Sequence, residues 1–138
     1  LGLDVVKFFP AEAAGGLKEG CEKVISGGPM MGFAMYTLDT PITKTSSSIL
    51  CLSKDEVSAS TATACINCGS CVEACPSRII PSRLADLAER HDEAGFVKMN
   101  GLECVECGSC SYVCPAKRHL KQAIGSMRKT ALANKKKK

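Results

Sequence analysis

The residues best suited to chemistry are two groups of four cysteines, each with the spacing Cys-x2-Cys-x2-Cys-x3-Cys and each followed by a proline. The eight cysteines are Cys65, Cys68, Cys71, Cys75, Cys104, Cys107, Cys110 and Cys114. Gaps of two residues let a curling backbone aim successive thiolates at one point, and this spacing is typical of [4Fe–4S] binding. Two complete sets, 39 residues apart, predict two clusters.

The fourth cysteine of each group predicts a crossed arrangement of ligands. In two-cluster ferredoxins the cysteine before the proline binds the cluster of the other group. We therefore expect two shared ligand sets. They are Cys65, Cys68, Cys71 and Cys114 for one cluster, and Cys104, Cys107, Cys110 and Cys75 for the other. With all eight positions used as ligands, we expect an electron relay with no iron open to substrate and no catalytic residue.

Other uses of these side chains fit the sequence less well. Structural zinc takes four ligands, usually as two spaced pairs, and closely spaced disulfides are rare in intracellular proteins. The isolated Cys21 and Cys51 are expected to be ordinary small apolar residues. His91 and His119 have no ligand partner at a suitable spacing, so we expect structural or solvated roles for them.

Two helices are expected to position the cysteine groups. The first would begin near Pro81 and end near Gly95, and the second would follow the second group. Their apolar residues recur at helical spacing, which predicts that the two stripes pack together and against the clusters. The stripes are Ile80, Leu84, Leu87, Ala88 and His91 in the first helix, and Leu120, Ile124, Met127 and Ala131 in the second.

The region before the cysteines has the character of a small sheet. Val24–Ile25 and Ile49–Leu52 are expected to be short strands, with a turn at Gly27–Pro29. Three methionines, Met30, Met31 and Met35, are expected to fill a core.

Composition limits the class of protein. The chain has 138 residues, no Trp and only 4% aromatic residues. Small cores this poor in large side chains usually depend on a metal or on disulfides. No run of 18 apolar residues is present, so the sequence predicts a soluble or peripheral protein.

Charge is distributed unevenly along the chain. From Cys107 to Lys138 there are nine basic and no acidic residues, whereas residues 1–106 carry more acidic than basic ones. A basic end attracts an acidic protein, a membrane surface or nucleic acid, or is simply solvated. Few aromatic residues are available for base stacking, so we expect no nucleic-acid partner.

Three stretches of the chain resemble the C-terminal half of the C subunit of the Rnf complex, an ion-translocating electron transport complex. The first is Glu22–Gly32, and the second is Pro41–Lys44 with the Ser-rich loop and strand after it. The third is the pair of cysteine groups with the residues that follow them, Cys75–Leu84 and Cys114–Arg118. Together the stretches lie between about Ala14 and Lys129.

The resemblance implies an α+β chain with a partial β-grasp region of the soluble-ligand-binding (SLBB) type, followed by an α-helical ferredoxin domain with two [4Fe–4S] clusters. On this basis residues 13–54 form the partial β-grasp domain and residues 55–63 a linker. Residues 64–130 form the ferredoxin domain and residues 131–138 a basic tail.

The resemblance also implies a function. Such a protein relays electrons in a ferredoxin:NAD oxidoreductase that is coupled to ion translocation, bound peripherally at the cytoplasmic face of the cell membrane. Its partners are the other subunits of the complex and redox proteins. The family's FMN- and NADH-binding domain is expected to be absent, so this chain alone would not be catalytic. The alternative is a free-standing ferredoxin-like electron carrier.

The first residues resemble a different family. Leu1–Glu12 is similar to the strand of KDPG aldolases that carries the Schiff-base lysine, which corresponds to Lys7. One strand cannot form an aldolase barrel, which takes about 250 residues. We treat residues 1–12 as a segment of uncertain role, with Lys7 a solvated lysine.

Overall fold

The computed structural model describes residues 20–40, 44, 46–55 and 59–137. Residues 1–12 with Lys7, the stretch 41–43 and residues 56–58 of the expected linker lie outside the described residues. Contacts divide the chain into two compact units, Leu1–Ala59 and Ser60–Lys138.

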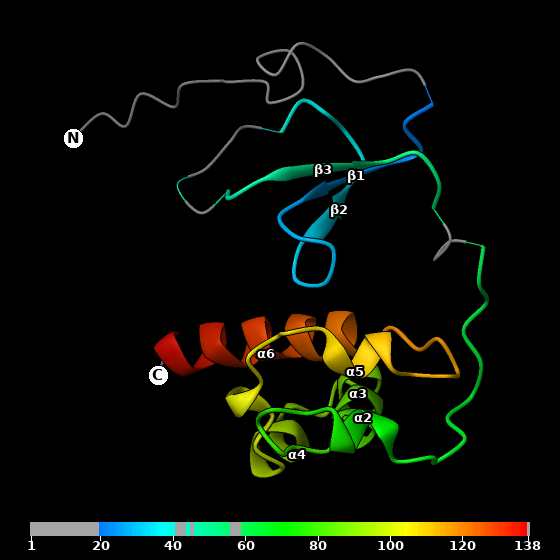
Figure 1. Cartoon of the computed structure of the whole chain (residues 1–138). Coiled ribbons are helices and arrows are strands. Elements are labelled where there is room, and N and C mark those ends of the chain that lie inside the picture. The colour runs from blue at the N-terminus through cyan, green and yellow to red at the C-terminus, as the bar shows by residue number, and fades with distance from the viewer. Residues whose placement is uncertain (1–19, 41–43, 45, 56–58, 138) are drawn as a thin grey trace. The chain divides into compact units, whose positions relative to one another are not determined.

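The first unit contains a three-stranded antiparallel sheet in the order β2-β1-β3 (Figure 1). The strands are β1 (Lys23–Ser26), β2 (Phe33–Met35) and β3 (Ile49–Leu52). Val24 in the central strand faces Met35 on one side and Cys51 on the other. The two predicted strands are present, and β2 is a third strand that the sequence pattern did not predict.

The turn between β1 and β2 lies at the predicted glycines. Gly27 has a φ of 103°, and the Gly32 N–H donates to the Gly28 carbonyl over 2.8 Å. This turn exposes Met30 and Met31, whose exposed fractions are 42% and 60%. The prediction that these two methionines fill a core is therefore wrong, because they sit at the tip of a hairpin and not on a buried strand face.

The second unit is helical, with short helices and one long one. Its elements are α2 (Ser70–Glu73), α3 (Pro81–Glu89), α4 (Glu93–Lys98), the 3-10 helix η1 (Gly101–Glu103), α5 (Ser109–Tyr112) and α6 (Leu120–Lys137). Among the described residues, no helix combines the length and the apolar character that crossing a membrane requires.

The expected first helix is two helices. Helix α3 ends at Glu89 because His91 adopts a left-handed conformation with a φ of 56°. Asp92 then caps α4 by accepting a hydrogen bond from the Gly95 N–H over 2.8 Å. Gly95 therefore lies inside α4 and not at the end of α3. A Cβ atom there would meet the Asp92 carboxylate, so this close cap favours glycine.

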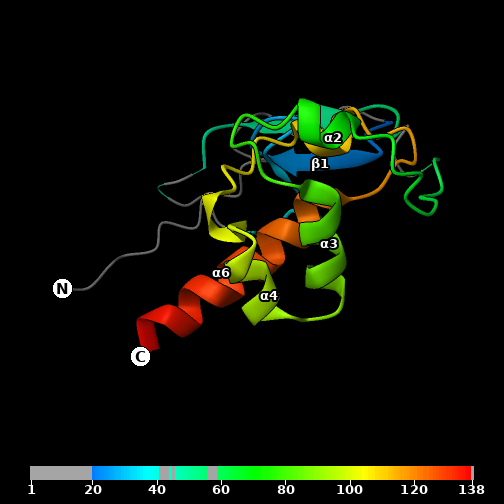
Figure 2. The ribbon, with the colours of Figure 1, turned by 90° about the horizontal axis from the view of Figure 1, so that it is seen from below.

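Helices α3 and α6 pack together and form most of the core (Figures 1 and 2). Leu84 of α3 and Ile124 of α6 are fully buried, as the apolar stripes predicted. Phe96 of α4 is also fully buried, against the Gly101 position. Two members of the first stripe differ from expectation: Ile80 is 43% exposed, since its neighbour Ile79 turns inward at the start of α3, and His91 is exposed beyond the helix end.

We expect Phe96→Ala to destabilise the helical unit by about 3–5 kcal/mol, because it removes a fully buried aromatic ring and leaves a cavity. The matched control is Val97→Ala at the next position, which is 43% exposed and should change stability by about 0.5 kcal/mol or less. Anaerobic urea denaturation followed by circular dichroism measures both. Equal effects of the two substitutions would show that Phe96 is not central to the core.

Candidate iron–sulfur sites

The two cysteine groups fold in the same way. In each, the short helix that carries the third cysteine follows a left-handed glycine, Gly69 with a φ of 82° or Gly108 with a φ of 85°. Cys71 and Cys110 are both 9% exposed. The two helices, α2 and α5, contact each other. The repeated sequence therefore forms the same local structure twice, and the two cysteine loops lie next to each other.

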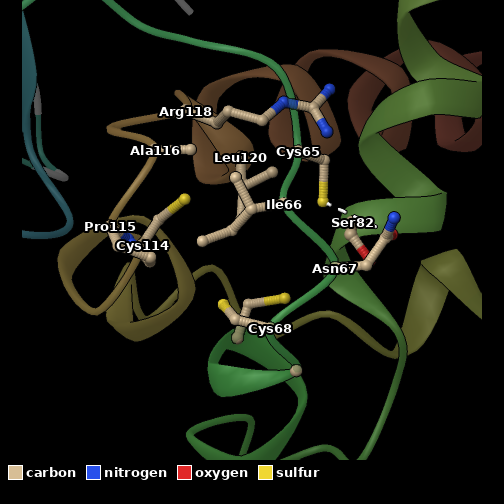
Figure 3. Close-up of a pocket in the computed structure, with 12 residues that line it drawn as sticks. Cys65, Ile66, Asn67, Cys68, Ser82, Cys114, Pro115, Ala116, Arg118 and Leu120 are labelled. Atoms are coloured by element: carbon tan, nitrogen blue, oxygen red, sulfur yellow. Dashed lines mark hydrogen bonds between the residues drawn. The ribbon is translucent and has the colours of Figure 1, made fainter.

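The first group and the end of the second group line one pocket of about 110 Å³. Its cysteines are Cys65, Cys68, Cys71 and Cys114. Figure 3 shows the Cys65, Cys68 and Cys114 side chains around a common space. The Thr63 N–H donates to the Ala116 carbonyl over 2.9 Å, which holds the segment before Cys65 beside the segment after Cys114.

The second pocket has the reciprocal composition. Its cysteines are Cys75, Cys104, Cys107 and Cys110. It is smaller, about 20 Å³, and its walls include Ile79, Pro81 and Ile124. The structure thus brings the eight cysteines together in the two sets of four that crossed ligation requires.

The donor sets fit iron–sulfur clusters. Within the described residues, no three His, Cys, Asp or Glu side chains converge tightly enough to hold a single metal ion. A [4Fe–4S] cluster makes a different demand, since each of its four irons takes one thiolate and the sulfurs surround the cluster. Four cysteines around a pocket supply that arrangement in each site.

Serine hydroxyls support one thiolate in each group. The Ser70 hydroxyl donates to Cys68 Sγ over 3.4 Å, and this hydrogen bond lowers the pKa of Cys68. At the equivalent position, Cys107 Sγ and Ser109 Oγ lie 3.5 Å apart, and the hydrogen bond likewise lowers the pKa of Cys107. Both effects favour the thiolate, which is the form that binds iron.

Burial acts in the opposite direction in the second site. Loss of hydration raises the pKa of Cys110 to about 11 and also raises the pKa of Cys104. In the first site, by contrast, Cys65 and Cys68 are exposed. A protonated Cys110 must release its proton to bind iron, so loading of the second site should be favoured as the pH rises.

The remaining cysteines and histidines lie elsewhere. Cys21 and Cys51 belong to the sheet unit, where Cys21 is partly buried and Cys51 is exposed. His91 and His119 are exposed. Sequence reasoning missed Arg118, which lines the first pocket and pairs with Asp86 and Glu89. Aligning the two repeats beyond the cysteines would have drawn attention to its position.

Comparison with known proteins agrees with this geometry. Residues 64–118 match the family model of a 4Fe–4S dicluster domain. The chain is 51% identical over 76 residues to the C subunit of the proton-translocating ferredoxin:NAD(+) oxidoreductase complex of Clostridium ljungdahlii. The aligned stretch covers 55% of this chain and 17% of that protein. It is 42% identical over 126 residues to the Na(+)-translocating counterpart of Acetobacterium woodii, which is 91% of this chain and 28% of that protein.

A third relative is the C subunit of the ion-translocating oxidoreductase complex of Methanosarcina acetivorans, with 45% identity over 113 residues, or 82% of this chain and 25% of that protein. The chain thus carries a 4Fe–4S dicluster domain. The predicted resemblance to the C subunit of the Rnf complex is confirmed. The chain spans between 17% and 28% of the length of these three relatives.

We expect Ser70→Ala to raise the pKa of Cys68 and so to slow its alkylation at neutral pH, because the thiolate is the reactive form. The experiment uses metal-free chain under reducing conditions, with iodoacetamide and peptide mass spectrometry. Cys107, which has its own serine partner, is the internal control and should keep its rate. An unchanged rate at Cys68 would contradict the role assigned to Ser70.

Proposed function

We propose that this chain relays electrons through two [4Fe–4S] clusters as part of an Rnf-type ferredoxin:NAD oxidoreductase complex coupled to ion translocation. The observation that carries the proposal is the reciprocal make-up of the pockets, each with three cysteines from one group and the fourth from the other. The similarity to the C subunits of three ion-translocating complexes supports the physiological setting.

In this proposal the first cluster is bound by Cys65, Cys68, Cys71 and Cys114, and the second by Cys104, Cys107, Cys110 and Cys75. A bound [4Fe–4S] cluster supplies one-electron chemistry. The protein supplies the rest: thiolates, the Ser70 and Ser109 hydroxyls, and apolar walls that limit water. Because each group serves both sites, the two clusters would stay close enough for an electron to pass between them. No described residue is assigned a catalytic role.

The sheet unit is proposed to be part of a β-grasp domain of the SLBB type that spans residues 13–54. In the same proposal residues 55–63 are a linker, residues 64–130 the ferredoxin domain and residues 131–138 a basic tail. The three antiparallel strands support this assignment. The similarity to the relative from Acetobacterium woodii also extends over 91% of the chain, and so beyond the cysteine region.

The partners are proposed to be other subunits of the complex and redox proteins. The chain is proposed to act at the cytoplasmic face of the membrane, to which it binds peripherally. The names of the relatives, each a subunit of a complex, support the partnership with other subunits. The basic end of α6, where Lys129, Lys135 and Lys136 are exposed, would suit an acidic partner or a membrane surface.

Crossed ligation predicts which pairs of cysteine substitutions remove one cluster and which remove both. Cys75→Ala with Cys107→Ala damages only the second site, so the protein should retain about four iron per chain. Cys75→Ala with Cys68→Ala damages both sites and should leave almost none. Iron and acid-labile sulfide analysis of anaerobically reconstituted protein measures both. Uncrossed ligation predicts the reverse order, with the 68/75 pair retaining one cluster.

The proposed setting predicts that the chain fractionates with membranes. An antibody against this chain, used on membranes from the source cells, should detect a much larger particle on a native gel than the single polypeptide that it detects on a denaturing gel. A high-salt wash should release part of the protein if the basic end of α6 contributes to binding. Recovery of the chain entirely as a small free protein would favour a free-standing electron carrier instead.

A further inference from the structure

The repeat allows the two sites to be compared position by position. With the offset of 39 residues, Arg118 corresponds to Ile79, and Ser82 corresponds to Lys121. Arg118 and Ser82 line the first pocket, whereas Ile79 and Lys121 line the second. The backbone is therefore repeated while the charges around the two sites are not.

The net charge of the two linings differs. Apart from its cysteines, the first pocket has Arg118 as its one charged lining residue among the residues that the structure describes. The second pocket is lined by Glu106 and Lys121, whose opposite charges offset each other. Each lining also has ion-pair partners outside it: Glu106 Oε1 lies 3.1 Å from Arg128 Nη1, and Arg118 pairs with Asp86 and Glu89.

Arg118 is held firmly at the edge of the first site. Its Nη2 lies 2.9 Å from Asp86 Oδ1 and 3.0 Å from Glu89 Oε1, both on α3. Its side chain is only 12% exposed. Figure 3 shows Arg118 beside Cys65 at the pocket that also contains Cys114. Arg118 follows Cys114 by four residues, so its ion pairs also fix the loop that carries this cysteine.

We propose that Arg118 makes the two sites unequal by raising the reduction potential of the first site, which it lines, and not that of the second. The proposal rests on the function proposed above. Reduction adds a negative charge, which a fixed guanidinium in the lining stabilises, and charge and solvent exposure are among the factors that set cluster potentials. The exposure of Cys65 and Cys68 acts in the same direction. Transfer of one electron from the second site to the first oxidises one and reduces the other, with no bond made or broken.

Arg118 is thus a positioning and tuning residue, whose effect falls on one site. Its loss would remove the positive charge and leave Asp86 and Glu89 unbalanced on α3, so both consequences lower the potential of the first site. Arg118 does not line the second pocket, so the reduction potential of the second site should stay unchanged.

The test is an EPR-monitored redox titration of Arg118→Gln in two backgrounds that each retain one site. In the protein with Cys75→Ala and Cys107→Ala, which keeps the first site, we expect at least a tenfold loss in the reduction equilibrium, about 59 mV for one electron. In the protein with Cys68→Ala and Cys114→Ala, which keeps the second site, we expect no shift. Arg83→Gln, at an exposed arginine of α3 that lines neither pocket, is the charge-matched control and should shift neither site.

Two further variants separate charge from structure. Arg118→Lys keeps the charge and should restore most of the potential. Glu89→Gln, at a side chain that is 59% exposed, removes a negative charge near Arg118 and should raise the potential of the first site, which tests the idea even where Arg118→Gln fails to load iron. An unchanged first-site potential in both Arg118→Gln and Glu89→Gln, with iron present, overturns the role of Arg118 alone. Absence of reducible clusters from the unsubstituted protein overturns the proposed function instead.

Discussion

The reciprocal sharing of cysteines between two pockets is the constraint on which the helical unit depends. Each pocket is lined by the end of the other cysteine group, which fits α2 and α5 lying together and the segments before Cys65 and after Cys114 running side by side. The helices that follow, α3 and α6, are then brought into contact and bury Leu84 and Ile124 between them. In a chain without Trp, such shared ligation would supply much of the stability that a larger core gives elsewhere.

The same constraint shapes the proposed electron transfer. Shared loops would keep two clusters close without a large scaffold, and the repeated Gly–Ser pairs place a hydroxyl beside one thiol in each group. The surroundings differ, however. Cys65 and Cys68 are exposed at the first pocket, while burial raises the pKa of Cys104 and Cys110 at the second. Electron transfer benefits when two sites differ in their surroundings, because different reduction potentials give the transfer a preferred direction.

The sequence predicted most of what local spacing controls. The cysteine pattern led to the two sets that line the pockets, and the stripes led to the buried Leu84 and Ile124. The sequence prediction was wrong where the backbone conformation of one residue determines where a helix begins or ends. His91 ends α3 in a left-handed conformation, and Gly95 serves the Asp92 cap inside α4, which a helical pattern alone does not show. Met30 is exposed because it lies at the tip of a hairpin, and the pairing of Arg118 with α3 depends on tertiary placement. Periodicity encodes neither.

The central claim is that two clusters lie close together in one small helical unit, and EPR spectroscopy of the dithionite-reduced protein tests it most directly. We predict about eight iron per chain. Partial reduction should give the simple spectrum of one reduced cluster, and full reduction should give a broadened spectrum with spin–spin coupling between two. Full reduction that yields one cluster, or two spectra that add without coupling, would contradict the account.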